Sequence, residues 1–145
     1  MDTTMLTKDG KSRKDVLYVS LVLDGESRDR LVSGCARYAP EWDGETIAEH
    51  HTIAFGAAVT EEIYRWAVEN EGVGFKVYAC EYGVSDKAFA VRLKTNIPCA
   101  NENKHITVMM NREAGGKPVD SNYITEWHNM PVIALNGTVR FKYKS

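Results

Sequence analysis

The chain of 145 residues has little cysteine and no closely spaced cysteine pair. Cys35, Cys80 and Cys99 are odd in number and widely spaced, which argues against a disulfide framework and a cysteine-rich zinc site and favours a reducing cytoplasm. No apolar run approaches the ~18 residues that span a bilayer. The polar N-terminus lacks the apolar middle of a signal peptide. We therefore expect a cytoplasmic protein without a membrane partner.

The sequence also lacks an excess of charge of one sign. It has 18 Lys and Arg against 20 Asp and Glu, for a net charge of -2. Proteins that coat long nucleic acids are usually strongly basic, so the expected substrate is a small nucleotide or a single RNA end. The length and the 43% hydrophobic content fit one compact domain over residues 16–145, after a flexible lead-in at 1–15. The composition does not fix the oligomeric state.

Hydrophobic periodicity predicts an α+β fold, mostly antiparallel sheet with two or three helices packed on one side. Capping residues and apolar stripes predict helices over 24–39 and 59–72. Alternation predicts strands over 16–23, 50–55, 75–83, 87–93, 105–110, 131–137 and 138–144. The last two strands are separated by Asn136-Gly137, a dipeptide typical of tight hairpin turns. The long segments 94–103 and 111–122 are predicted to be loops.

Two of the four histidines occur in the same local pattern. His50 in HHTIAF and His105 in HITVMM each stand two positions before a threonine and open an apolar strand. Because side chains alternate across a strand, His50 and Thr52 share a face, and so do His105 and Thr107. The opposite faces then carry His51, Ile53 and Phe55 in the first strand, and Ile106, Val108 and Met110 in the second, with Met109 on the histidine side. These apolar sets should face the core.

A pair of imidazoles beside a pair of hydroxyls has a chemical use. Histidine titrates near neutral pH, so one ring can accept a proton while another donates one. Threonine hydroxyls can hold the oxygens of a phosphate. His50, His105, Thr52 and Thr107 around one phosphorus would form an acid–base site for phosphodiester cleavage that needs no metal or other cofactor. The pattern does not say which histidine is the acid.

The repeated His-x-Thr-hydrophobic pattern, HHTI and HITV, resembles the two-histidine (2H) phosphoesterase superfamily. IPCANENKHITV followed by KPVDSN looks most like the cyclic phosphodiesterase branch of fungal-type tRNA ligases and related viral proteins. The resemblance implies two pseudo-symmetric lobes of antiparallel sheet with outer helices and a central cleft. It also implies a metal-independent phosphodiesterase in which His50 and His105 are catalytic and Thr52 and Thr107 bind phosphate. Members of the superfamily open 2',3'-cyclic phosphates, cleave 2'-5' linkages, trim RNA ends or, in phages, destroy cyclic nucleotides of antiviral signalling. A small stand-alone domain suits the last group, which would place the protein in a host cytoplasm.

Other polar and aromatic residues are candidates for substrate contact. Tyr18 and Ser20 share a face of the first strand, opposite Leu17, Val19 and Leu21, and Tyr18 could stack on a base. Trp42 lies in a predicted loop, and Ser121 and Asn122 lie in the loop after the second motif, where a segment could close over a substrate. His51 is expected to pack or to play a supporting role. Trp127 is a loop aromatic that could cap a nucleobase but is expected chiefly to pack, and His128 is a loop histidine outside the His-x-Thr pattern.

Three functional hypotheses remain open at this point. The first is the phosphodiesterase, acting on a cyclic nucleotide or cyclic oligonucleotide, or on an RNA 2',3'-cyclic phosphate or 2'-5' linkage. The second is a module that binds a nucleotide without turnover. The third is a metal site formed by His50, His51 and His105, which lacks an evident carboxylate or thiolate partner. The paired motifs favour the enzyme, because sequestration needs no paired proton donor and acceptor.

Overall fold

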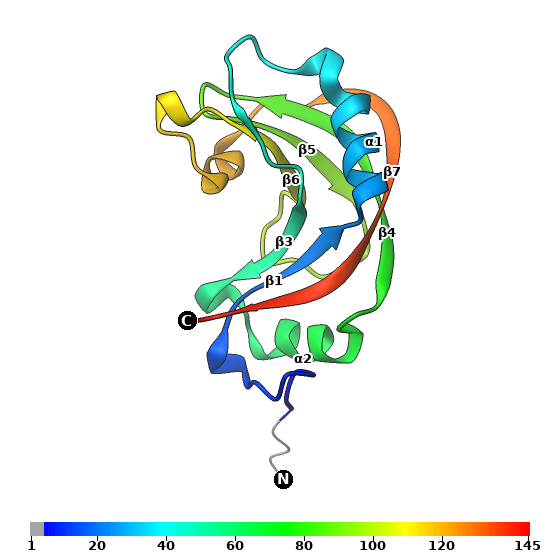
Figure 1. Cartoon of the computed structure of the whole chain (residues 1–145), viewed down its shortest axis with the longest axis vertical. Helices are drawn as coiled ribbons and strands as arrows, with labels where there is room; N and C mark the ends of the chain where they lie inside the picture. Colours follow the sequence, from blue (N-terminus) through cyan, green and yellow to red (C-terminus); the bar gives the residue numbers. More distant parts are fainter. Residues whose placement is uncertain (1–4) are drawn as a thin grey trace.

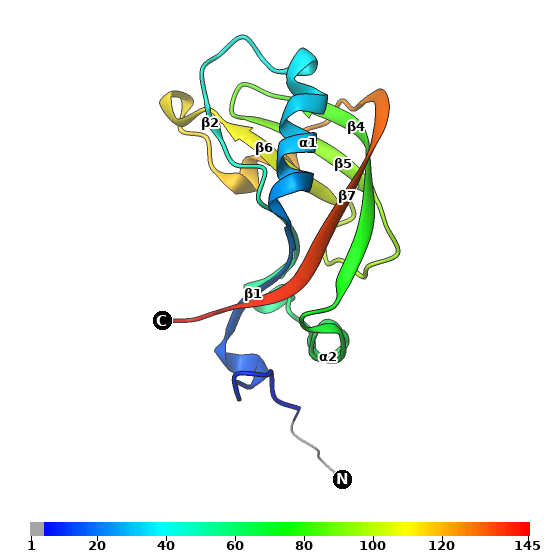
Figure 2. The same cartoon turned by 45° about the vertical axis from the view of Figure 1, so that its right-hand side comes forward.

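The computed structural model describes residues 5–145 and shows a mixed α+β fold built on one curled antiparallel sheet. Its seven strands lie in the order β2-β6-β5-β4-β7-β1-β3. In Figures 1 and 2 the long strand β7 bends along the length of the molecule and joins the upper strands to the lower ones. The strands are β1 (Val16–Leu23), β2 (Glu45–Thr46), β3 (His50–Phe55), β4 (Gly74–Val84), β5 (Ala88–Lys94), β6 (His105–Met110) and β7 (His128–Tyr143).

Two α-helices begin at the capping residues that the sequence indicates. The Asp24 side chain accepts a hydrogen bond from the Ser27 N–H at the start of α1 (Gly25–Cys35), and Thr60 accepts one from Ile63 at the start of α2 (Glu61–Asn70). Each cap satisfies a backbone donor that the first helical turn leaves free. Short 3-10 turns follow α1 at Ala36–Tyr38 and precede α2 at Gly56–Ala58.

Both helices cover the same face of the sheet. A Cβ on Gly34 of α1 would lie 2.6 Å from the Ile133 side chain of β7, which shows how closely the two elements pack. Tyr64 of α2 packs against Phe141 of the same strand, with ring centroids 5.9 Å apart. Ile133 and Phe141 point to one side of β7 because they are an even number of residues apart. The main core lies on this side of the sheet, and neither α-helix covers the opposite side.

The predicted turn at Asn136-Gly137 is wrong. Both residues lie inside the single strand β7, where Gly137 pairs with Leu23 of β1 and with Phe75 of β4. A Cβ on Gly137 would lie 2.7 Å from the Leu21 side chain and 2.9 Å from a β1 carbonyl. The glycine is therefore required for the close approach of β1, and not for the backbone conformation of a turn.

Residues 1–15 were predicted to be a flexible lead-in, but residues 5–15 pack against the rest of the domain. Thr7 is buried, and its hydroxyl accepts a hydrogen bond from Tyr143 at 2.8 Å. The Tyr64 hydroxyl donates toward the carbonyls of Met5 and Lys11. A 3-10 turn, Arg13–Asp15, then leads into β1. Residues 5–15 are thus tied to α2 and β7, while residues 1–4 of the predicted lead-in lie outside the described residues.

Between residues 5 and 145, none of the helices combines the length and the apolar character that crossing a bilayer requires.

Candidate active site

The strand register carries both His-x-Thr motifs to the face opposite the helices. Residues paired directly across antiparallel strands point to the same side. Thr52 pairs with Ser20, and Ser20 pairs with Arg140 on β7. The same face continues from β7 to Tyr78 on β4, and Tyr78 pairs with Lys94 on β5. Arg92 lies two residues before Lys94, on the same side of β5, and pairs with His105 on β6. His50 and Thr52 therefore share a sheet face with His105 and Thr107.

Each motif strand contains one extra residue directly after its threonine. In β3, Thr52 pairs with Ser20 and Ala54 with Val19, so Ile53 has no opposite partner on β1. In β6, Thr107 pairs with Ala90 and Met109 with Phe89, so Val108 is the extra residue. Such β-bulges bend a strand and re-aim its side chains, and they are common next to active sites. The two motifs are thus alike in backbone structure as well as in sequence.

The bulges overturn part of the predicted alternation. Phe55 was expected in the core, but it is 59% exposed and lies on the motif face beside Tyr18. Met109 was expected on the face of His105, but it pairs with Phe89 and packs against the main core. Met110 was expected on the core face with Ile106; it is buried, but it pairs with Ala88, which belongs to a separate small cluster with Ala90 and Ile124. Strict alternation fails from the bulge onward because one added residue reverses every later side chain.

The two motif strands lie side by side although they are far apart in the sheet order. The Ala48 N–H donates to the Thr107 carbonyl at 3.0 Å, and the imidazole Nδ1 of His51 lies 3.1 Å from the carbonyl oxygen of His105. These two bonds join the segment that carries the first motif to the backbone of the second motif. The Ala100 N–H, in the loop before β6, donates to the Ile53 carbonyl at 2.8 Å.

His105 is held in one tautomer. Its Nδ1 lies 2.7 Å from the Asn103 carbonyl oxygen, which can only accept, so Nδ1 carries a proton and Nε2 is left as the reactive nitrogen. Burial lowers the pKa of His105 below its usual value, and the bond to Asn103 partly offsets this. The ring is therefore largely neutral at pH 7, with Nε2 able to accept a proton.

His50 is held by an aromatic ring. It stacks on Tyr18, with ring centroids 5.7 Å apart and the planes 14° from parallel. Tyr18 in turn stacks on the exposed Phe55 at 5.9 Å. Burial lowers the pKa of His50, while the nearby carboxylate of Glu49 raises it. The predicted contact residue Tyr18 thus lies next to the first motif. Phe55 lies beside Tyr18 on the same face, although the predicted alternation had assigned Phe55 to the core.

The loop after the second motif reaches one of the predicted phosphate-binding threonines. Ser121, in the 3-10 helix Pro118–Tyr123, is fully buried, and its Oγ lies 2.7 Å from Oγ1 of Thr107. If Ser121 donates in this bond, the Thr107 hydroxyl keeps its own proton for a ligand. Asn122 is exposed, and its Oδ1 accepts a hydrogen bond from Asn101 at 2.6 Å, which links the loops on either side of β6.

Two predicted contact residues have clear structural partners. Ser20 is on the motif face but only 2% exposed, because it lies between Thr52 and Arg140 in the middle of the strands. Trp42 packs against the main core, and its Nε1 donates to the Ser85 carbonyl at 3.1 Å. Trp42 therefore anchors the segment before β2 to the core.

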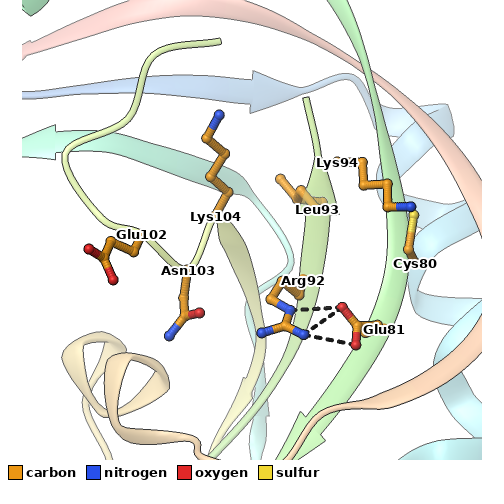
Figure 3. Close-up of a pocket in the computed structure, with 8 residues that line it drawn as sticks. All are labelled: Cys80, Glu81, Arg92, Leu93, Lys94, Glu102, Asn103 and Lys104. Carbon is orange, nitrogen blue, oxygen red and sulfur yellow. Dashed lines mark hydrogen bonds and ion pairs between the residues drawn. The ribbon is translucent and has the colours of Figure 1, made fainter. Parts of the chain in front are cut away.

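A pocket of about 250 Å³ is lined in part by Asn103 and Lys104, which directly precede His105 of the second motif. Figure 3 shows its lining residues. Arg92 lines it and is paired with both oxygens of Glu81 at 2.8 Å. The indole ring of Trp127 lies over the Arg92 guanidinium, 5.0 Å from ring centroid to carbon. No local pattern singles out Arg92, because its position opposite His105 depends on strand order. Trp127, which could cap a nucleobase but was expected chiefly to pack, does pack here, against Arg92. The other lining residues are Cys80, Leu93, Lys94, Glu102, Asn103 and Lys104.

The motif face is rich in cations. Strand pairing places five basic side chains on it: Lys76, Arg92, Lys94, Arg140 and Lys142. Within the described part of the chain, an ion pair offsets the charge of Arg92 alone, through Glu81. Such a distribution attracts anions although the chain as a whole is slightly acidic. Among the residues that the structure describes, no three His, Cys, Asp or Glu side chains gather in a way that could hold a metal ion.

The chain was also compared with known proteins. No protein-family model matches it, and no curated protein does so either. The functional interpretation of the motif face therefore rests on its own chemistry: two half-buried imidazoles, two threonines and a cationic surround on adjacent strands.

Proposed function

We propose that this protein is a metal-independent phosphodiesterase that hydrolyses a phosphodiester bond of a small nucleotide, with His50 and His105 as the acid–base pair. The observation that carries the proposal is the junction between the motif strands. Ala48 and His51, on either side of His50, bond to the backbone carbonyls of Thr107 and His105. Two copies of one short motif are thereby held next to each other, on one face, with the same backbone bulge after each threonine.

The reaction needs one neutral and one protonated histidine. The neutral ring removes a proton from water, whose oxygen forms a bond to phosphorus. The bond from phosphorus to the leaving oxygen breaks, and the protonated ring donates its proton to that oxygen. The lowered pKa values of both rings make a neutral base available near pH 7, and the negative phosphate favours protonation of the other ring once substrate is bound.

The threonines and cations have distinct roles in this proposal. Thr52 and Thr107 donate hydrogen bonds to the non-bridging oxygens of the phosphate as negative charge develops there. Arg140 and Lys142 lie across from Ser20 and Tyr18, and so draw an anionic substrate toward the first motif. In the finer description of the fold that goes with this proposal, the strands form two pseudo-symmetric 2H-like lobes with the motifs between them.

The direct test is turnover in the presence of EDTA. The substrates are a cyclic dinucleotide, a cyclic trinucleotide, a 2',3'-cyclic mononucleotide and a linear 2'-5' oligomer, with products separated by chromatography. We expect at least one to be hydrolysed, and His50→Ala and His105→Ala each to lower kcat by about 10²–10⁴-fold, the usual contribution of a general acid or base.

His128→Ala is a matched control for these variants. His128 is exposed and pairs with Tyr82, whose ring packs against the core on the helix side of the sheet. This variant should keep the activity of the native protein. Binding of a nucleotide without loss of substrate would instead identify a binding module, and activity abolished by EDTA would contradict a metal-independent reaction.

A further inference from the structure

His51 is a buried histidine whose ring is only half satisfied. It is 1% exposed, its Nδ1 lies 3.1 Å from the His105 carbonyl oxygen, and its buried Nε2 has no hydrogen-bond partner among residues 5–145. The carbonyl can only accept, so Nδ1 donates and Nε2 is an unpaired acceptor. A leucine would fill similar space without burying an unpaired polar atom. The bond to His105 is therefore the interaction that favours a histidine at this position.

This bond continues a ladder that the backbone leaves unfinished. The N–H groups of Ile47 and Ala48 donate to the carbonyls of Val108 and Thr107. The chain then turns away at Ala48, whose φ of 48° is in the left-handed region, and Glu49 already bonds to β1 through Leu23. The next carbonyl of β6 on this side belongs to His105, two residues before Thr107. The His51 side chain supplies the donor that the diverging backbone no longer provides.

We propose that His51 is a positioning residue, which ties the backbone of His105 to β3 and so fixes the spacing between the His50 and His105 imidazoles. His50 and His51 are consecutive and point to opposite faces, so any shift of His51 against β6 moves His50 as well. The inference rests on the proposed function. It adds to that function a residue that touches neither substrate nor phosphate but determines whether both rings reach the same phosphorus.

The test compares His51→Leu with His51→Asn. Leucine fills the space and removes the donor, whereas the Nδ2 of asparagine takes the place of the imidazole Nδ1 and can still donate to the His105 carbonyl. We expect His51→Leu to lower kcat by about 10–100-fold, because small misplacements of reacting groups have effects of this size, with KM changed by less than about threefold. His51→Asn should restore kcat to within about threefold of the native value.

Val77→Ala controls for loss of stability alone. Val77 is fully buried in the core on β4, away from the motif strands. This variant should lower the melting temperature and leave kcat within about twofold of the native value when assayed well below that temperature. Native kcat in His51→Leu would overturn the inference, and so would an equal loss in His51→Leu and His51→Asn.

A second measurement needs no substrate. The NMR signals of the His105 imidazole report its tautomer, which Asn103 holds through Nδ1. With the backbone of His105 released in His51→Leu, we expect these signals to shift toward an average of both tautomers, and to return to the native pattern in His51→Asn. Unchanged His105 signals in His51→Leu would overturn the positioning role. Absence of turnover by the native protein, with the expected NMR changes, would reject the proposed function while leaving the link between His51 and His105 in place.

Discussion

Three of the histidines are close together, and their surroundings give them different chemistry. His51 is enclosed in the core, and burial lowers its pKa to about 4, so it stays neutral at pH 7. His50 and His105 are half-buried on the motif face, where burial also lowers the pKa of each, but by less than full enclosure does. The ring that stays neutral at pH 7 is therefore a structural donor, and the two less buried rings are the proposed acid–base pair.

The lowered pKa values of His50 and His105 predict an acidic optimum for kcat/KM. The base must be neutral, so activity rises as the pH increases through its pKa. The acid must be protonated, so activity falls as the pH increases through the pKa of the other ring. Both values lie below the usual 6.5, so the bell-shaped profile should have its maximum below pH 6.5.

Bound phosphate should move the corresponding kcat profile to higher pH, because its negative charge favours the protonated rings. The check is initial rates from pH 4.5 to 9 for the best substrate. A flat profile over that range would show that these rings transfer no proton in the rate-limiting step.

The lowered pKa of His51 predicts that the folded state becomes less stable in acid. Unfolded histidine has a pKa near 6.5, and folded His51 has one of about 4. Between these values the unfolded chain binds a proton that the folded chain does not, so the free energy of unfolding decreases as the pH falls. The full difference is about 3 kcal/mol. Urea unfolding at pH 7, 5.5 and 4.5 should show a smaller loss for His51→Asn than for the native protein, and parallel losses would contradict the prediction.

At the scale of the strands, β-bulges set the side-chain directions in the two motif segments, and a glycine lets β7 continue where a turn was predicted. Ile53 and Val108 are extra residues that return the chain to the core after each threonine. Gly137 lets β7 pass close to β1 without a turn, so one strand of sixteen residues can pair with both β1 and β4. The Asn-Gly dipeptide that resembles a hairpin is thus part of the strand that connects the upper and lower strands.

Gly137→Ala should destabilise the protein. The added Cβ would lie 2.7 Å from the Leu21 side chain and 2.9 Å from the Val22 carbonyl, both in a packed strand. We expect a loss of about 1–3 kcal/mol in the free energy of unfolding, typical of overpacking, measured by urea denaturation. Gly74→Ala is the matched control, because its nearest contact, the Gly137 carbonyl, is at an ordinary 3.8 Å. Equal stabilities for the two variants would contradict the strand assignment of Gly137.

The molecule as a whole separates a stabilising face from a polar one. Both helices pack on one side of the sheet with the main core, and the other side carries the two motifs and most of the basic side chains that the strands present. The loop after β6 lies partly over this polar side, where Ile124 and Trp127 pack on Ala88 and Ala90 of β5. That packing places Ser121 against Thr107 and Trp127 against Arg92.

The basic residues of the motif face predict salt-dependent capture of substrate. Replacing Arg140 and Lys142 together with glutamine should raise KM about 3–10-fold at low salt and leave kcat nearly unchanged, because these exposed charges attract the substrate without touching the reacting atoms. The difference from the native protein should shrink at 0.5 M NaCl, where the Debye length is only a few ångströms. Arg65→Gln, on the exposed face of α2, should have no effect on KM. A loss of kcat at all salt concentrations would assign the pair a different role.

The sequence by itself determined the α+β class, the position of most strands and helices, and the two motifs, because these depend on local periodicity, capping residues and spacing. It also identified Tyr18 and Ser121 as residues worth attention near the motifs. Only the tertiary structure decided that β3 lies against β6, that Gly137 continues a strand, and that bulges turn Phe55 outward. These features depend on contacts between residues far apart in the chain, such as His51 with His105 or Gly137 with Leu21, and no local pattern encodes them.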